Sequence, residues 1–296
     1  MRLGAFNIND PVPELNEPHA LAFLKPWVDV GNVGTLVLSH IESHLNAREL
    51  AKLDRPGNFF DFTRYRPTLY VKEGRREIEI PNVTITSSKT GKGHDFLFLR
   101  LLEPHMLAED YIDSILQVFQ RFGVKRYCLI GAMYDMIPYT RPILVSGTAS
   151  NTELQSELKA AHVISSDYQG PTSIAYLINQ QAVQMGIETI SLVVHLPRYF
   201  MVENDYRGMI RLMEVLNSLY AFPMAPESIV LTAKQQEEQA RQIAEQMIAE
   251  EPRLKLILNQ LEASYDSRLG EDLADIQLSS EVEKFLQDLD KRFRQG

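Results

Sequence analysis

Polar side chains that can bind ligands or move protons stand where the strand-like apolar runs of this sequence end. These side chains are Asp29, Glu103, Tyr134, His195 and Tyr199. In open α/β sheets, ligands bind in the crevice beyond the carboxyl ends of the strands, so we expect these residues to share one rim. The alternative interpretation is that they only begin loops, where polar residues occur in any protein.

Two proline-containing segments contribute three more binding candidates. In the segment PYTRP, prolines fix the backbone around Arg141, whose planar guanidinium can hold a carboxylate, a phosphate or a partner's acidic side chain. We predict that Arg141 is a functional or interface residue; the alternative is a buried ion pair within its own subunit. In the segment YQGPTS, we expect Gly170 to turn the chain and Pro171 to start a helix. Thr172 then places its hydroxyl at a helix N-terminus, which suits anions.

Gly31 lies in a turn between the first predicted strand and the first predicted helix. The spacing of Gly31 and Gly34 is part of a phosphate-cradling pattern, and phosphate binding and plain backbone packing both remain open. The sequence contains no GxSxG, HExxH, Walker A or GxGxxG motif, so we assign no catalytic residue. His40 and His44 are four residues apart but have no third ligand at metal-binding spacing, so we predict no metal and no cofactor.

The bulk composition excludes several classes of protein. Of the 296 residues, 45% are hydrophobic and 23% are charged, which is typical of a chain that buries a full core. A net charge of −9 is unsuited to nucleic-acid backbones and to anionic membranes. The first residues do not resemble a signal peptide, and no apolar run reaches the length of about 18 residues that predicts a membrane span. The single cysteine, Cys128, is expected to be buried and inert, and we predict a cytoplasmic protein.

Apolar runs that alternate with amphipathic segments predict a three-layer α/β/α sandwich with a mostly parallel mixed sheet. The predicted strands are 20–24, 96–102, 126–131, 143–146 and 188–196. The predicted helices are 35–45, 106–122, 172–185 and 206–220. Residues 46–94 predict two or three further strands, antiparallel at least in part, with a hairpin turn at Glu73–Gly74.

Three regions are expected along the chain. Residues 1–19 contain three prolines and predict an extended N-terminal arm. Residues 20–226 form the α/β domain, and residues 227–296, with nine basic and 15 acidic side chains, form an acidic helical extension. Its C-terminal helices are predicted at about 232–250, 252–266 and 279–294. We interpret them as a helical hairpin packed on its own domain or on a neighbouring subunit, with a separate binding module as the alternative.

Several segments resemble the proteasome assembly chaperone 2 family in its bacterial and archaeal branch. They are Arg66–Pro67, LLEP (Leu101–Pro104), GVKRYCLIGA (Gly123–Ala132), PYTRP, SGTAS (Ser146–Ser150), YQGPTS and SLVVHLPRYF (Ser191–Phe200). The match runs from about residue 20 to about residue 225. The resemblance implies a phosphorylase/hydrolase-like fold, homo-oligomers and, for some relatives, a role in assembling or activating proteasomes. The C-terminal extension departs from the short family members, and no lysine- and glycine-rich clamp supports an ATP-grasp grouping.

The leading hypothesis is a non-enzymatic, homo-oligomeric assembly-chaperone-like or scaffold protein that contacts itself and a proteasome-like or other protein partner. The rival is a small-ligand-binding protein or enzyme of the phosphorylase/hydrolase-like class, which would use the rim residues Glu103, Arg141, Thr172 and His195. A deep cleft that holds these side chains would favour the rival, and a flat or filled rim would favour the scaffold. For self-association, the apolar candidates are the Phe59–Phe62 loop and the Leu254–Leu261 stripe.

Overall fold

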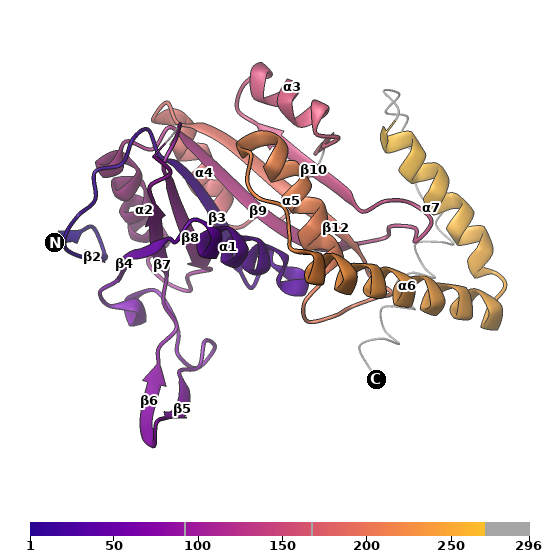
Figure 1. The fold of residues 1–296 in the computed structure, drawn as a ribbon, viewed down its shortest axis with the longest axis horizontal. Coiled ribbons are helices and arrows are strands. Elements are labelled where there is room, and N and C mark those ends of the chain that lie inside the picture. The colour runs from indigo at the N-terminus through magenta and orange to yellow at the C-terminus, as the bar shows by residue number, and fades with distance from the viewer. Residues whose placement is uncertain (92, 167, 270–296) are drawn as a thin grey trace.

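The computed structural model describes residues 1–91, 93–166 and 168–269, which build one large mixed sheet between two helical layers (Figure 1). Ten strands form this sheet. In spatial order they are β1 (Arg2–Leu3), β2 (Phe6–Ile8), β4 (Arg48–Leu53), β7 (Thr84–Ser88), β8 (Phe96–Leu102), β3 (His19–Lys25), β9 (Arg126–Asp135), β12 (Glu188–Pro197), β10 (Leu144–Ala149) and β11 (Ile164–Ser165).

The centre of the sheet is parallel and its flanks are largely antiparallel. Strand β3 pairs in parallel with β8 and β9, and β9 pairs in parallel with β12. Antiparallel pairs add β7, β4, β2 and β1 on one side and β10 on the other, where β11 then joins β10 in parallel. The mixed sheet is therefore confirmed, with its parallel pairs concentrated in the four central strands, whose carboxyl ends form one rim.

Helices cover both faces of the sheet. One face carries α1 (Val33–His44), α3 (Thr152–Ala160) and α5 (Tyr206–Tyr220), and the other carries α2 (Ala108–Phe122) and α4 (Ile174–Gln184). Alternation along β3 explains why both faces are apolar, because Ala20 and Leu24 contact the layer of α2 and α4 while Phe23 contacts the layer of α1 and α5. The predicted three-layer α/β/α sandwich is confirmed.

The N-terminal residues, expected to form an extended arm, include two strands of the sheet. Strand β2 pairs with β4, with Phe6 opposite Leu53. Phe6 and Ile8 are buried in the core. These apolar side chains alternate with exposed Asn7, so the segment closes one edge of the sheet with the pattern of a half-buried strand.

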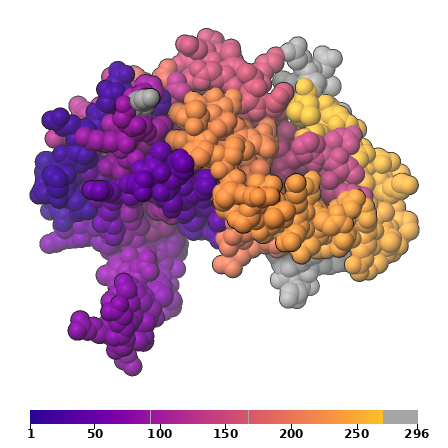
Figure 2. Space-filling view, in the orientation of Figure 1, coloured from indigo at the N-terminus to yellow at the C-terminus, as the bar shows by residue number. Residues whose placement is uncertain are grey.

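The strands β5 (Thr68–Lys72) and β6 (Arg75–Glu79) form a separate hairpin that projects from the body (Figures 1 and 2). Its turn is at Glu73–Gly74, as predicted, and both residues have positive φ angles, 50° and 78°, which the favoured two-residue hairpin turn requires. The Phe59–Phe62 loop is not the exposed apolar surface that the sequence suggested. Phe59 and Phe60 are buried against the ring of Tyr111, at centroid distances of 5.5 and 6.3 Å.

Two C-terminal helices, α6 (Glu227–Glu250) and α7 (Leu254–Leu269), lie at one end of the molecule (Figure 1). They match the first two predicted helices of the extension, and the third, at 279–294, lies outside the described residues. Ile257, Leu261 and Tyr265 follow one another at four-residue spacing on α7, and their side chains are buried against the α/β domain. This part of the Leu254–Leu261 stripe is therefore covered by its own chain. None of the helices in residues 1–91, 93–166 and 168–269 combines the length and hydrophobicity of a membrane span.

Candidate functional site

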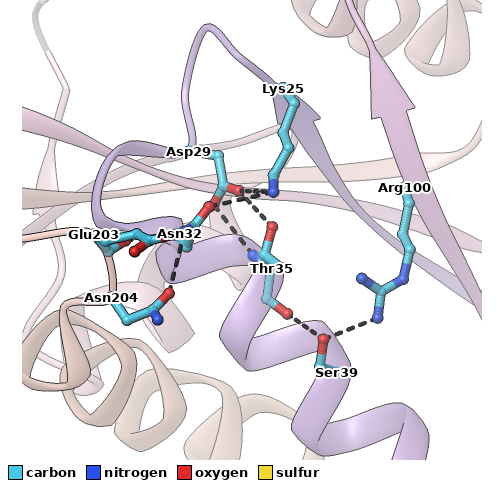
Figure 3. Close-up of polar contacts among 8 residues, drawn as sticks. All are labelled: Lys25, Asp29, Asn32, Thr35, Ser39, Arg100, Glu203 and Asn204. Atoms are coloured by element: carbon cyan, nitrogen blue, oxygen red, sulfur yellow. Dashed lines mark hydrogen bonds and ion pairs between the residues drawn. The ribbon is translucent and has the colours of Figure 1, made fainter. Parts of the chain in front are cut away.

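Asp29 lies just after β3 and is enclosed, with 1% of its side chain exposed. One carboxylate oxygen accepts a hydrogen bond from the Thr35 main-chain N–H at 3.1 Å, and the other accepts one from the Thr35 hydroxyl at 2.5 Å. The Lys25 ammonium lies 3.6 Å from the same carboxylate (Figure 3). Burial raises the pKa of Asp29. The carboxylate therefore occupies the N-terminus of α1, where a phosphate would otherwise bind.

Gly31 and Asn32 join this turn to the start of α5. Gly31 has a φ angle of 60°, and a Cβ placed on it would lie 2.8 Å from Cβ of Asp205. The Asp205 main-chain N–H donates to the Gly31 carbonyl at 2.8 Å, and the Asn32 amide donates to the Glu203 carbonyl at 2.9 Å. The same amide donates to the Asn204 side chain at 3.1 Å (Figure 3). Of the two interpretations of the Gly31–Gly34 turn, these contacts favour close backbone packing.

Arg100 of β8 extends the polar contacts along α1 (Figure 3). Its guanidinium donates to the Ser39 hydroxyl at 3.0 Å and forms an ion pair with Glu42. Ser39 in turn donates to the Thr35 carbonyl at 2.7 Å. Each charged side chain in this series of contacts, from Lys25 to Glu42, thus has a partner within the fold. The protein's own side chains therefore fill this end of the rim.

A second polar network joins the ends of β9, β12 and β10. With Nδ1 of His195 protonated, the imidazole donates to the Asp135 carboxylate at 2.8 Å and accepts from the Ser146 hydroxyl at 2.7 Å. Ser146 and His195 are only 6% and 9% exposed. Burial alone would raise the pKa of Asp135, but the hydrogen bond from His195, with Met136 N–H and Arg268, holds that pKa well below its usual value.

The order of hydroxyl, imidazole and carboxylate is that of a serine nucleophile with its general base. Acyl transfer also needs N–H donors directed at the developing oxyanion. Ser146 lies within β10, between β12 and β11, where hydrogen bonds between the strands occupy the neighbouring main-chain groups. These groups do not serve as donors to an oxyanion. We therefore interpret the network as a structural contact that holds the ends of β9, β12 and β10 together.

Two arginines connect the rim to α7. The Arg141 guanidinium contacts both carboxylate oxygens of Asp266, from Nε at 2.8 Å and from Nη2 at 2.7 Å. Arg268 of α7 reaches back to Asp135 at 3.2 Å. Arg141 also lies 3.5 Å from Glu262. Arg141 is thus paired within its own subunit, as the alternative interpretation held, but at the surface and not in the core.

Glu103 occupies the N-terminus of α4 as Asp29 occupies that of α1. Its carboxylate accepts a hydrogen bond from the Ile174 N–H at 3.0 Å, and burial raises its pKa. The expectation that Pro171 starts this helix is wrong, because α4 begins at Ile174 and the exposed Thr172 precedes it. Gly170, also exposed, lies in the same approach segment, where the Tyr168 hydroxyl donates to the Pro171 carbonyl at 2.9 Å.

Tyr134 and Tyr199 both have apolar surroundings: Tyr134 packs against the core, and Tyr199 lines a cavity. Tyr134 is half-buried in β9 against the layer of α1 and α5, and burial raises its pKa. The Tyr199 hydroxyl is buried and has no hydrogen-bond partner among the described residues, and burial raises its pKa too. Tyr199 lines an apolar cavity of about 100 Å³ between the residues after β9 and the helices α6 and α7. The cavity walls are Met136, Ile137, Pro138, Tyr139, Arg198, Tyr199, Ala244, Met247, Ile248, Leu254, Ile257, Leu258 and Leu261.

Three of the four residues of the rival hypothesis have separate sets of partners, and the fourth, Thr172, is exposed. Glu103 contacts the start of α4, Arg141 contacts α7, and His195 contacts Asp135 and Ser146. Cys128 is fully buried, as expected, and burial raises its pKa to about 12. In the part of the chain that the structure describes, no three His, Cys, Asp or Glu side chains are grouped to hold a metal ion.

The sequence comparison decides the family. The model of the PAC2 family matches residues 23–244, which span most of the α/β domain and most of α6. The chain belongs to the PAC2 family. No curated protein matches it.

Several solved structures share the fold of this PAC2 protein. A PAC2 family protein from Streptomyces avermitilis has a TM-score of 0.70 at 24% identity, over 79% of this chain and 98% of that one. A proteasome-assembly chaperone homologue from Mycobacterium tuberculosis has a TM-score of 0.67 at 21% identity, over 75% and 94% of the two chains. PbaB from Pyrococcus furiosus, an archaeal proteasome activator, has a TM-score of 0.65 at 16% identity, over 82% and 99%.

Proposed function

We propose that this PAC2 protein is a non-enzymatic, homo-oligomeric assembly chaperone or scaffold that acts through protein–protein contacts, with a proteasome-like complex as one class of partner. The names of the M. tuberculosis and P. furiosus structures support a chaperone-like role. The acidic composition and the single buried cysteine support a cytoplasmic location.

The observation that carries this proposal is that the carboxylates and the imidazole of the rim are paired within the chain. In open α/β sheets, a ligand approaches the carboxyl ends of the strands, where helix N-termini attract anions. Here the carboxylates of Asp29 and Glu103 accept the hydrogen bonds of α1 and α4 that an anion would receive. His195 is enclosed by its own partners. Surface contacts with other proteins, which need no cleft, fit this arrangement better than turnover of a small substrate.

Recovery of the tagged protein from a native lysate, followed by mass spectrometry, tests the proposal. We expect the same protein partner above a tag-only control for the wild type and for Ser146→Ala, because that hydroxyl is enclosed. Failure to recover any protein above the control would count against a chaperone or scaffold.

The Ser146–His195–Asp135 network is the observation that favours an enzyme. A fluorophosphonate probe, which forms a covalent bond with a nucleophilic serine, separates the two functions. We expect no labelled Ser146 peptide by mass spectrometry. Labelling of Ser146 that is lost in His195→Ala would support a hydrolase instead.

A further inference from the structure

An apolar cavity lies where the C-terminal helices pack against the α/β domain. Its volume is about 100 Å³, and the domain contributes Met136 and Ile137, which follow β9, to its wall. The facing wall consists of Ala244 and Met247 of α6 and Leu258 of α7. Because the two helices supply one side of this space, the cavity exists only while α6 and α7 stay packed on the domain.

The hydroxyl of Tyr199 is a polar group placed in these apolar surroundings. Tyr199 lines the cavity, and its hydroxyl oxygen is buried without a hydrogen-bond partner among the described residues. Burial raises the pKa of Tyr199, so the group stays a neutral O–H that can both donate and accept. Buried polar groups in proteins are nearly always hydrogen-bonded, because leaving one unpaired costs free energy. A ligand oxygen beside this hydroxyl would supply the missing hydrogen bond.

The walls favour an aromatic ring over water as the occupant. The surface of the cavity is almost entirely apolar, so a water molecule would lack the roughly two to four polar partners that hold buried water in place. An apolar cavity of roughly 150 Å³ binds benzene. The rings of Tyr139 and Tyr199 and the thioethers of Met136 and Met247 are groups that pack well against an aromatic ring. Methionine side chains also adapt their shape, so this cavity can widen around a ring.

We propose that this cavity binds a small aromatic molecule that carries one hydrogen-bonding oxygen. The ring lies between the domain and the helices α6 and α7, and the oxygen forms a hydrogen bond with the Tyr199 hydroxyl. Neither Asp29 nor Glu103 lines the cavity, and binding involves no chemical step, so the site goes beyond the proposed function without replacing it. The bound molecule holds α6 and α7 against the domain, because it contacts both sides.

Phenol and toluene test the site, because they have nearly the same shape and only phenol carries an oxygen. We expect both to bind the 296-residue chain saturably in titration calorimetry. Tyr199→Phe should weaken the binding of phenol by about fivefold, the effect of one hydrogen bond, and leave toluene within about twofold. The matched control is Tyr139→Phe, because Tyr139 also lines the cavity but its hydroxyl lies near the charges of Glu245 and Glu262. The control should change neither affinity by more than about twofold.

A second variant fills the cavity. Ala244 lines it from α6 and is buried, so Ala244→Met should abolish the binding of both probes. The melting temperature should stay the same or rise, because the added side chain occupies empty space. The control is Ala249→Met, at an exposed position of the same helix, which should bind both probes like the wild type. If Ala244→Met fails to fold, the comparison of phenol and toluene in Tyr199→Phe still decides.

Three outcomes would overturn the inference. Failure of both probes to bind would remove the site, and undiminished binding to a folded Ala244→Met variant would place the probes elsewhere. A Tyr199→Phe variant that binds phenol as tightly as the wild type would overturn the hydrogen bond to the ligand. None of these outcomes bears on the chaperone or scaffold role, which recovery of protein partners from a lysate tests separately.

Discussion

Replacing Asp135 with asparagine tests whether the second rim network stabilises the fold. The substitution keeps the shape of the side chain but removes the charge that His195 contacts at 2.8 Å and Arg268 contacts at 3.2 Å. A hydrogen bond to a charged group contributes about 1.5–3 kcal/mol. Because the Arg268 side chain is 42% exposed, most of the loss belongs to the contact with His195. We expect Asp135→Asn to lower the free energy of unfolding by about 2 kcal/mol at pH 7.

This loss should depend on pH in a defined direction. The pKa of Asp135 is held below its usual value in the folded protein, whereas the unfolded chain takes up a proton at the ordinary value of about 3.9. The stabilisation from Asp135 is therefore complete above about pH 5 and is lost as the pH falls toward the lowered pKa. Asparagine does not titrate, so the difference between wild type and variant should shrink over the same range.

Urea denaturation followed by circular dichroism, from pH 7 down to about pH 3, measures both effects. The control is Asp113→Asn, an exposed position on α2, which should change the free energy of unfolding by less than about 0.5 kcal/mol. A variant at Asp135 that is as stable as the wild type at pH 7 would refute the structural role of the network. A loss that stays constant down to pH 3 would refute the assignment of the charge to Asp135.

The remaining predictions concern α7, the two helix starts and metal dependence. Arg141→Lys removes the two-pronged contact with Asp266, so limited proteolysis between α6 and α7 should become faster while the α/β domain keeps its melting temperature; an unchanged cleavage rate would contradict the role of this pair. Gly31→Ala should destabilise more than Gly123→Ala in denaturant melts, because both glycines have positive φ angles but only a Cβ at Gly31 meets another atom; equal losses would contradict the close approach. Glu103→Ala should cost about 1 kcal/mol by removing the carboxylate at the start of α4, and Glu103→Gln should cost less because its amide oxygen can accept the same hydrogen bond. Thermal melts with and without a chelator should coincide, and a drop of many degrees with the chelator would reveal a structural metal.

The sequence predicted the strongly patterned elements well. Strand β8 and helix α5 have the bounds that were expected, because a near-continuous apolar run and a regular amphipathic period each specify one structure. Helix α3 was not predicted. It is short and buries only Leu154 and Leu158, so its period is weak, and its start depends on the Asn151 side chain, which accepts from the Leu154 N–H at 2.9 Å.

The position of the rim could be predicted from the sequence, but the hydrogen bonds and ion pairs between its side chains could not. Ser146 and His195 are separated by 49 residues and meet through the antiparallel register of β10 and β12, which no motif records. Asp266 lies 125 residues from Arg141 and meets it only because α7 folds back onto the domain. Phe59 suggested an exposed loop because polar residues surround it, yet contact with α2 buries it.

Native mass spectrometry of the protein recovered gently from its own cell extract tests the central claim most directly, because it weighs the intact assembly. A chaperone or scaffold predicts an assembly that contains more than one copy of the 33.8 kDa chain together with a stoichiometric protein partner. A single copy of the chain that carries only a small molecule would contradict the account.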